Sequence, residues 1–223
     1  MRQFQGIIQS HDGLESAPTA PTAVALFAEQ GFEATTLRQL AERAGVSPAL
    51  VYRYFPSKRA LVLALYDVLS LEFAERAKEL PAGRWRERFL FALRTSLAVL
   101  RPHRSTLVAL VPVLVGGEES LFAPATAFSR ERVAQVFVEA VTGAADAPRG
   151  ALASALGRVL YLAHLGHILW WLLDRSSGQR ATAALVALTA RALPPFALTL
   201  KLPPVRGLVA DFDAAAQQAL FER

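Results

Sequence analysis

The stretch from Thr36 to Lys58, TLRQLAERAGVSPALVYRYFPSK, limits what this chain can fold into more than any other feature. Four of its apolar residues recur at the spacing of one helical face: Leu37, Leu40, Ala41 and Ala44. Thr36 stands where a side-chain oxygen caps a helix start, and Gly45 stands where a left-handed residue ends one. The pattern predicts a short helix followed by a tight turn.

A second helix is predicted directly after this turn. Ser47 is an N-cap residue, and Pro48 suits the first helical position because its amide hydrogen is not needed there. Val51 and Phe55 form an i, i+4 pair on one side, whereas the other side carries Arg, Tyr and small residues. Two short helices joined by a Gly-containing turn are typical of a helix-turn-helix, whose second helix enters the major groove of DNA. We therefore expect a DNA-binding protein.

Charge and composition agree with this expectation. The net charge is +5 and the isoelectric point is near 10.1, which favours an anionic partner. Between residues 31 and 60 there are five basic side chains against two acidic ones. Hydrophobic residues make up 53% of the chain and charged residues 19%, so we expect apolar surface at an oligomer interface or a ligand cavity.

The location of the protein is predicted from what the sequence lacks. Zero cysteines exclude disulfides and thiolate metal sites. The N-terminal segment has one basic residue and no apolar run of secretory length. The longest apolar stretch, residues 159–173, has 15 residues and two histidines, fewer than the roughly 20 that a membrane span needs. We expect a cytoplasmic protein with no membrane segment.

Periodicity and Pro/Gly breaks predict an all-α fold in four parts. These are a poorly defined N-terminal segment, a three-helix helix-turn-helix domain, a connecting helix with the stripe Leu61, Leu65, Val68, Leu69 and Phe73, and a larger helical ligand-binding and dimerisation domain. The parts cover residues 1–20, 21–57, 58–80 and 81–223. Within them, helices are expected near 21–30, 58–80, 84–100, 103–115, 125–142, 149–175, 178–192 and 208–222.

Two of these helices, near 149–175 and 178–192, are unusually apolar. Between residues 151 and 173 the only charged residue is Arg158. Such surfaces predict helical partners, either as a four-helix interface in a homodimer or as the core of the monomer. The sequence leaves both readings open.

Residues 22–70 resemble the tetracycline-repressor (TetR) family of bacterial transcription regulators. The matching text, Ala25 to Leu65, is ALFAEQGFEATTLRQLAERAGVSPALVYRYFPSKRALVLAL. The resemblance implies dimers that bind palindromic operators, an internal ligand cavity, and a dimer interface from the last two long helices. Members usually begin with a basic stretch that contacts phosphates, whereas here no Lys or Arg lies between Arg2 and Arg38.

The family pattern and helix geometry together select the DNA-contacting residues. Arg53 is expected to read a guanine bidentately, or else to contact a phosphate. Leu50 is expected to touch a thymine methyl group or simply to pack. Phosphate contacts that position the protein are expected elsewhere. The full set is Thr36, Arg38, Ser47, Ala49, Leu50, Tyr52, Arg53, Tyr54 and Lys58.

A ligand pocket is predicted among aromatic and histidine residues of the larger domain, with packed core as the alternative. The set is Trp85, Phe89, Phe122, Tyr161, His164, His167 and Trp171. His164 and His167 lack a third ligand at helical spacing, so we expect no metal and no cofactor. The chain shows no arrangement of nucleophile, base and orienting group, so we do not expect an enzyme.

These observations predict a homodimeric transcriptional regulator. We expect a repressor that a small hydrophobic effector releases from a palindromic operator on double-stranded DNA. The alternative is a constitutive dimeric DNA-binding factor with no small-molecule ligand.

Overall fold

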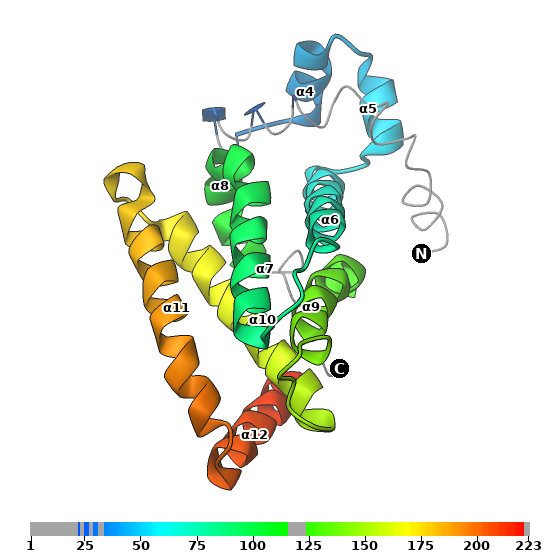
Figure 1. The fold of residues 1–223 in the computed structure, drawn as a ribbon. Coiled ribbons are helices and arrows are strands. Elements are labelled where there is room, and N and C mark those ends of the chain that lie inside the picture. The colour runs from blue at the N-terminus through cyan, green and yellow to red at the C-terminus, as the bar shows by residue number, and fades with distance from the viewer. Residues whose placement is uncertain (1–21, 23–24, 27–28, 31–33, 116–123, 221–223) are drawn as a thin grey trace. The chain divides into compact units, whose positions relative to one another are not determined.

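The computed structural model describes residues 22, 25–26, 29–30, 34–115 and 124–220 (Figure 1). Within these ranges the regular elements are helices, with no strand, and the predicted all-α fold is confirmed. The predicted N-terminal segment 1–20 lies outside the described residues. Of the helix expected near 21–30, the described residues Thr22, Ala25, Leu26, Glu29 and Gln30 are helical.

The chain divides into two compact units. One comprises the described residues of Met1–Tyr66 and His103–Glu119, and the other comprises those of Asp67–Pro102 and Ser120–Arg223. The helix α6 (Lys58–Ala77) contributes its first part to the first unit and its second part to the second. The predicted domain limits at residues 20, 57 and 80 stay a prediction.

The first unit contains α4 (Leu37–Ala44), α5 (Pro48–Tyr54), the start of α6 and α8 (Arg104–Val115). These helices hold one another through a shared apolar core, since two short helices alone bury too little surface to be stable. The core consists of Leu26, Leu37, Leu40, Ala41, Val51, Phe55, Leu61, Val62 and Leu110. α8 thus supplies a core residue to the helix-turn-helix that lies some 50 residues away in sequence.

The second unit contains the remaining long helices. They are α7 (Trp85–Leu100), α9 (Ala127–Thr142), α10 (Ala151–Leu173), α11 (Arg180–Thr199) and α12 (Pro203–Leu220), with short 3₁₀ turns at Arg101–His103, Pro124–Thr126 and Ser177–Gln179. α10 packs against α9, α12 and α11, and α7 packs against α9. At the contact between α9 and α10, a Cβ added to Gly157 would lie 2.5 Å from the Cα of Val138. Only glycine fits at that point, because the obstructing atom belongs to the backbone.

The second unit also buries an ion-pair network that the sequence did not indicate. Asp67 is 4% exposed, and its Oδ1 accepts hydrogen bonds from Arg132 and from the Ser129 hydroxyl, both at 2.8 Å. This polar contact ties α6 to α9. The predicted apolar stripe of α6 is therefore wrong at Val68, which is 38% exposed, because the neighbouring Asp67 faces the interior and Val68 turns outward.

Two predicted helix limits are also wrong. α11 continues through Pro194 and Pro195 to Thr199, where a break was expected. Both prolines are exposed, so water can satisfy the carbonyl groups that lose an amide partner. Leu193 and Leu200 on either side are buried, and this packing holds the helix together. α12 begins at Pro203 and not at 208, since proline suits the first turn of a helix.

α10 and α11 have the length and composition of membrane-spanning helices. The apolar window of α10 is 39% buried within the fold, and that of residues 177–199, which include α11, is 11% buried. Arg158 in the middle of α10 forms an ion pair with Asp213 of α12, and His167 bonds to Thr189 of α11 at 2.8 Å. The paired charge of Arg158 and the close packing of α10 on α9 and α12 account for the apolar composition of α10.

Candidate nucleic-acid interface

The turn between α4 and α5 is built by capping interactions. Thr36 Oγ1 accepts a hydrogen bond from the Gln39 amide at 3.2 Å, and the Gln39 side chain accepts from the Thr36 amide at 2.8 Å. Gly45 ends α4 with φ 67° and ψ 28°, a left-handed conformation in which a Cβ would be strained. The Val46 amide then donates to the Ala41 carbonyl at 3.0 Å. The predicted cap and stop residues are confirmed.

α5 begins immediately after this turn and exposes most of its circumference. Ser47 Oγ accepts from the Leu50 amide at 3.2 Å, and Pro48 occupies the first turn. Val51 is fully buried. Since each helical residue advances by about 100°, Ala49 and Arg53 lie on the side opposite Val51. One side of α5 therefore packs into the core through Val51, and the opposite side is exposed to solvent.

The basic side chains of this unit differ in whether an acidic side chain of the protein already pairs with them. Arg43 donates two hydrogen bonds to Glu29, at 2.9 and 2.6 Å, and Arg38 forms an exposed ion pair with Glu42 at 3.3 Å. Arg53 is exposed and has neither a hydrogen bond nor an ion pair to any residue of the described part of the chain. A guanidinium without a protein partner on an outward face is available for an external acceptor.

The other residues predicted to contact DNA lie around α5 and its flanks. Tyr52, Tyr54 and Leu50 are 52%, 38% and 36% exposed, which is unusual for large apolar and aromatic side chains within one turn of one another. Ala49 is exposed, and Lys58 is partly buried at the start of α6. Thr36 and Ser47 both serve as caps. Their contacts with DNA stay predictions.

Most of the described residues predicted to form a ligand pocket are buried. Phe89, Tyr161, His164 and Trp171 are between 1% and 3% exposed. The rings of Phe137 and His164 are 4.5 Å apart. Trp85 lines an open cleft elsewhere in the same unit, and Phe122 lies outside the described residues. The pocket assignment therefore stays a prediction.

The two histidines of that set have different surroundings. His164 Nε2 lies 2.8 Å from Ser96 Oγ, and burial, reinforced by the charge of His167, lowers the pKa of His164 to about 3. His167 bonds to the Ala163 carbonyl at 2.7 Å and to Thr189. Across the described ranges no group of three or more His, Cys, Asp or Glu residues is placed to hold a metal ion.

Several structural residues were missed by sequence reasoning, and one of them had a signal. Arg158 is the only charge within α10, and a lone charge in an apolar helix indicates a buried partner. That partner is Asp213, 55 residues away. Arg132, the partner of Asp67, had no comparable signal, because it lies among other polar residues in the sequence.

The geometry defines a helical protein with an exposed helix-turn-helix, the architecture of DNA-binding regulators. The sequence model described as "Bacterial regulatory proteins, tetR family" matches residues 22–65. A tetR-family transcriptional regulator from Streptomyces coelicolor has a similar fold, with a TM-score of 0.59 and 21% identity over 89% of this chain and 87% of that one. A possible tetR-family regulator from Streptomyces coelicolor A3(2) is 28% identical over 92% and 94% of the two chains, with a TM-score of 0.52.

Curated relatives match over the DNA-binding region alone. The uncharacterized HTH-type transcriptional regulator YerO of Bacillus subtilis is 36% identical over 66 residues, which are 28% of this chain and 23% of that protein. YuxN of the same organism is 41% identical over 46 residues, which are 21% of this chain and 16% of that protein. The chain thus matches less than a quarter of the length of these relatives. Residues 22–65 thus match the tetR family of bacterial transcriptional regulators, and the chain shares the fold of solved tetR-family structures.

Proposed function

We propose that this protein is a homodimeric repressor that binds a palindromic operator through α5 and is released by a small, largely apolar effector. The observation that carries the proposal is the outward face of α5. Arg53 is exposed there without a partner among the described residues, directly opposite the buried Val51. A protein that binds DNA as a repressor works in the cytoplasm of a bacterial cell.

The dimer is proposed to form through α10 and α11. On α11 several exposed residues follow one helical face: Ala184, Leu188, Arg191 and Pro195. On α10 the exposed residues do the same: Ala163, Gly166, Trp170 and Leu173. Small and apolar residues at these spacings suit the close packing of a four-helix interface. Leu188 and Leu173 are 53% and 61% exposed, which a second protomer would cover.

The proposed release of the repressor from DNA depends on the distance between the two recognition helices, which a palindromic operator fixes. Two recognition helices bind successive major grooves only when they lie about 34–36 Å apart. An effector that favours a different spacing of the two α5 helices shifts the population away from the DNA-bound form. α6 is one continuous helix that belongs in part to each unit, so it is the element through which we expect the change to pass.

The proposal is tested first by recovering DNA. Purified full-length protein is mixed with fragmented genomic DNA, and the retained fragments are sequenced. We expect an inverted repeat whose half-sites are centred about 10 base pairs, or a multiple of this, apart. Retained fragments without a common sequence would contradict the proposal.

Single substitutions then separate base reading from backbone contact. We expect Arg53→Ala to lose about 1–3 kcal/mol of discrimination between the operator and a variant altered at one guanine. We expect Lys58→Ala to weaken binding to all sequences alike and to reduce the salt slope by about one. Arg43→Ala is the matched control, because Glu29 already occupies its guanidinium. Unchanged discrimination in Arg53→Ala would remove Arg53 from the reading role.

A constitutive dimeric DNA-binding factor is the second candidate. It is favoured by the burial of Phe89, Tyr161 and His164, which pack together in the interior of the larger unit. Thermal unfolding in a panel of apolar compounds distinguishes the two. A ligand present at about 100 times its Kd adds about 2.7 kcal/mol to the free energy of unfolding. Operator binding that no compound alters would favour the constitutive factor.

A further inference from the structure

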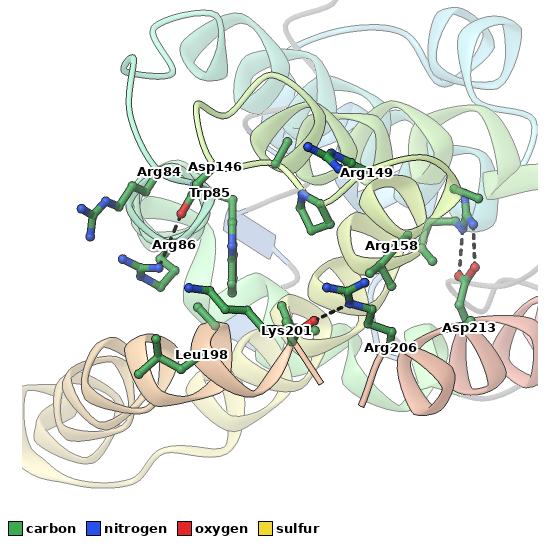
Figure 2. Close-up of a pocket in the computed structure, with 18 of the residues that line it drawn as sticks. Arg84, Trp85, Arg86, Asp146, Arg149, Arg158, Leu198, Lys201, Arg206 and Asp213 are labelled. Atoms are coloured by element: carbon green, nitrogen blue, oxygen red, sulfur yellow. Dashed lines mark hydrogen bonds and ion pairs between the residues drawn. The ribbon is translucent and has the colours of Figure 1, made fainter. Parts of the chain in front are cut away.

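An open cleft of about 1170 Å³ lies in the second unit (Figure 2). Among the described residues predicted to form a pocket, Trp85 lines this cleft and the others do not. It is bordered by the start of α7, the loop before α10, the first half of α10, the end of α11 and the start of α12. The volume is slightly above the range for small-molecule sites, which is about 300–1,000 Å³.

The charges around the cleft do not balance. Six basic and two acidic residues line it: Arg84, Arg86, Arg149, Arg158, Lys201, Arg206, Asp146 and Asp213. Asp213 accepts two hydrogen bonds from Arg158, at 2.8 and 2.5 Å. Asp146 lies 3.5 Å from Arg86. Both carboxylates are therefore already compensated within the fold.

Four basic side chains remain, and they come from three separate parts of the chain. Arg84, Arg149, Lys201 and Arg206 are exposed and form no ion pair with any residue between 34 and 115 or between 124 and 220. Figure 2 shows Lys201 and Arg206 projecting from the junction of α11 and α12, with Arg149 coming from the loop before α10. Four unpaired cations around one concavity repel each other, and an anion would relieve that repulsion.

Two of the cleft's walls are held in place by hydrogen bonds. Arg206 Nε donates to the Leu200 carbonyl at 2.9 Å, which orients the guanidinium and leaves its two terminal nitrogens without a described partner. Asp146 Oδ1 accepts from the Trp85 amide at 2.8 Å and so fixes the loop to the start of α7. Preformed donors bind a ligand at a smaller entropic cost than mobile ones.

The helix termini add to the positive potential. α10 begins at Ala151, which lines the cleft, and has no acidic side chain in its first turn. The first amide groups of a helix carry a partial positive charge that favours an anion.

The remaining lining is apolar. Leu198, which is 65% exposed, lines the cleft together with Leu152, Pro194 and Ala197. A purely inorganic anion would leave this surface uncovered. The lining therefore suits a molecule with an acidic group at one end and an apolar body at the other.

We infer that this cleft binds a small amphipathic anion, with its carboxylate or phosphate held by Lys201, Arg206 and Arg149 and its apolar part lying against Leu198. Of the described residues in the predicted aromatic pocket, Trp85 alone lines this site. The inference does not depend on the proposed repressor function. Anion binding at this cleft can be measured without DNA, so the two can fail separately.

The test uses calorimetric titration of the full-length protein with four probes of equal chain length: decanoate, decyl phosphate, decanol and decyltrimethylammonium. At least one of the two anions is expected to bind, more weakly as salt is added, while the alcohol and the cation bind much less. Either anion alone supports the inference and identifies the acidic group. Decanol binding as tightly as both anions would overturn it.

Reversing the charge of one lining residue tests whether the anion binds in this cleft. Lys201→Glu is expected to weaken anion binding by about fivefold or more, because an exposed attraction is replaced by a repulsion of similar size. Arg94→Glu is the matched control, since Arg94 is exposed on α7 and does not line the cleft, and its affinity should stay within about twofold of the wild type. Equal affinities in the two variants would place the anion elsewhere and overturn the inference. A short DNA duplex that displaces the anion from the wild type would also overturn it, by showing a nucleic-acid surface.

Discussion

At the scale of single residues, His164 is the most unusual group in the larger unit. It is 3% exposed and its ring packs against those of Phe73 and Phe137. Its Nε2 contacts Ser96, while its Nδ1 has no hydrogen-bond partner in the described part of the chain. A charged imidazolium in this place would lack solvation, and this lowers its pKa to about 3. The folded protein therefore keeps His164 neutral.

This burial predicts a loss of stability in acid. Between about pH 6.5 and the folded pKa of about 3, the unfolded chain binds a proton at His164 that the folded chain does not. The free energy of unfolding then falls by about 1.4 kcal/mol for each pH unit below 6.5. Urea unfolding at pH 6.5 and pH 5, at one protein concentration, should show a loss of about 2 kcal/mol from this group.

The matched variant is His164→Gln, which cannot titrate and still offers a hydrogen bond to Ser96. It is expected to be less stable than the wild type at neutral pH, since ring packing with Phe73 and Phe137 is lost. Its free energy of unfolding should nevertheless change less between the two pH values. Parallel pH profiles for the two proteins would show that His164 is not the titrating group.

At the scale of helices, the contact of α9 with α10 depends on the absence of one side chain. A Cβ at Gly157 would meet the Val138 Cα at 2.5 Å and the Phe137 carbonyl at 3.1 Å. These atoms are backbone, so α9 itself would have to move. We expect Gly157→Ala to lower the free energy of unfolding by about 1–3 kcal/mol, measured by thermal or urea unfolding.

Gly207 provides the control for this prediction. It also lies within a helix, α12, but a Cβ there would meet nothing within 4 Å. Gly207→Ala should therefore be neutral or stabilise by up to about 1 kcal/mol through helix propensity. A Gly157→Ala variant as stable as Gly207→Ala would mean that the helices separate without cost.

At the scale of the whole molecule, the exposed faces of α10 and α11 make dimerisation testable. Leu188 lies in the middle of the proposed interface on α11 and is 53% exposed in a single chain. A glutamate there would be buried without a partner in the dimer. We expect Leu188→Glu to shift the protein from dimer to monomer in sedimentation experiments, and to weaken operator binding as a consequence.

Leu208→Glu is the corresponding control, because Leu208 on α12 is 67% exposed outside the proposed interface. It should remain dimeric at the same concentration. Both variants place the same charge on an exposed helix, so a general effect of charge would appear in both. Dimers of equal stability would move the interface away from the centre of α11.

Local chemistry made the helix-turn-helix predictable from its own residues. The caps and turn residues of this region act on backbone groups within four positions of themselves. The sequence pattern alone therefore predicts them: Thr36, Gly45, Ser47 and Pro48. The family resemblance rests on the same stretch. The outward direction of Arg53 follows from the spacing to Val51.

Everything that depends on distant partners was decided by the tertiary structure. Asp67 pairs with Arg132 and Arg158 with Asp213 across 65 and 55 positions, and α11 continues through its prolines because Leu193 and Leu200 are buried. The basic cleft gathers Arg84, Arg149, Lys201 and Arg206 from parts of the chain that share no motif. Helical periodicity shows which face of a helix is apolar, but not which other helix covers it. The sequence by itself therefore determined the helix-turn-helix, because its signals are local. Packing alone decided where the second unit concentrates its positive charge, because the residues concerned are distant in sequence.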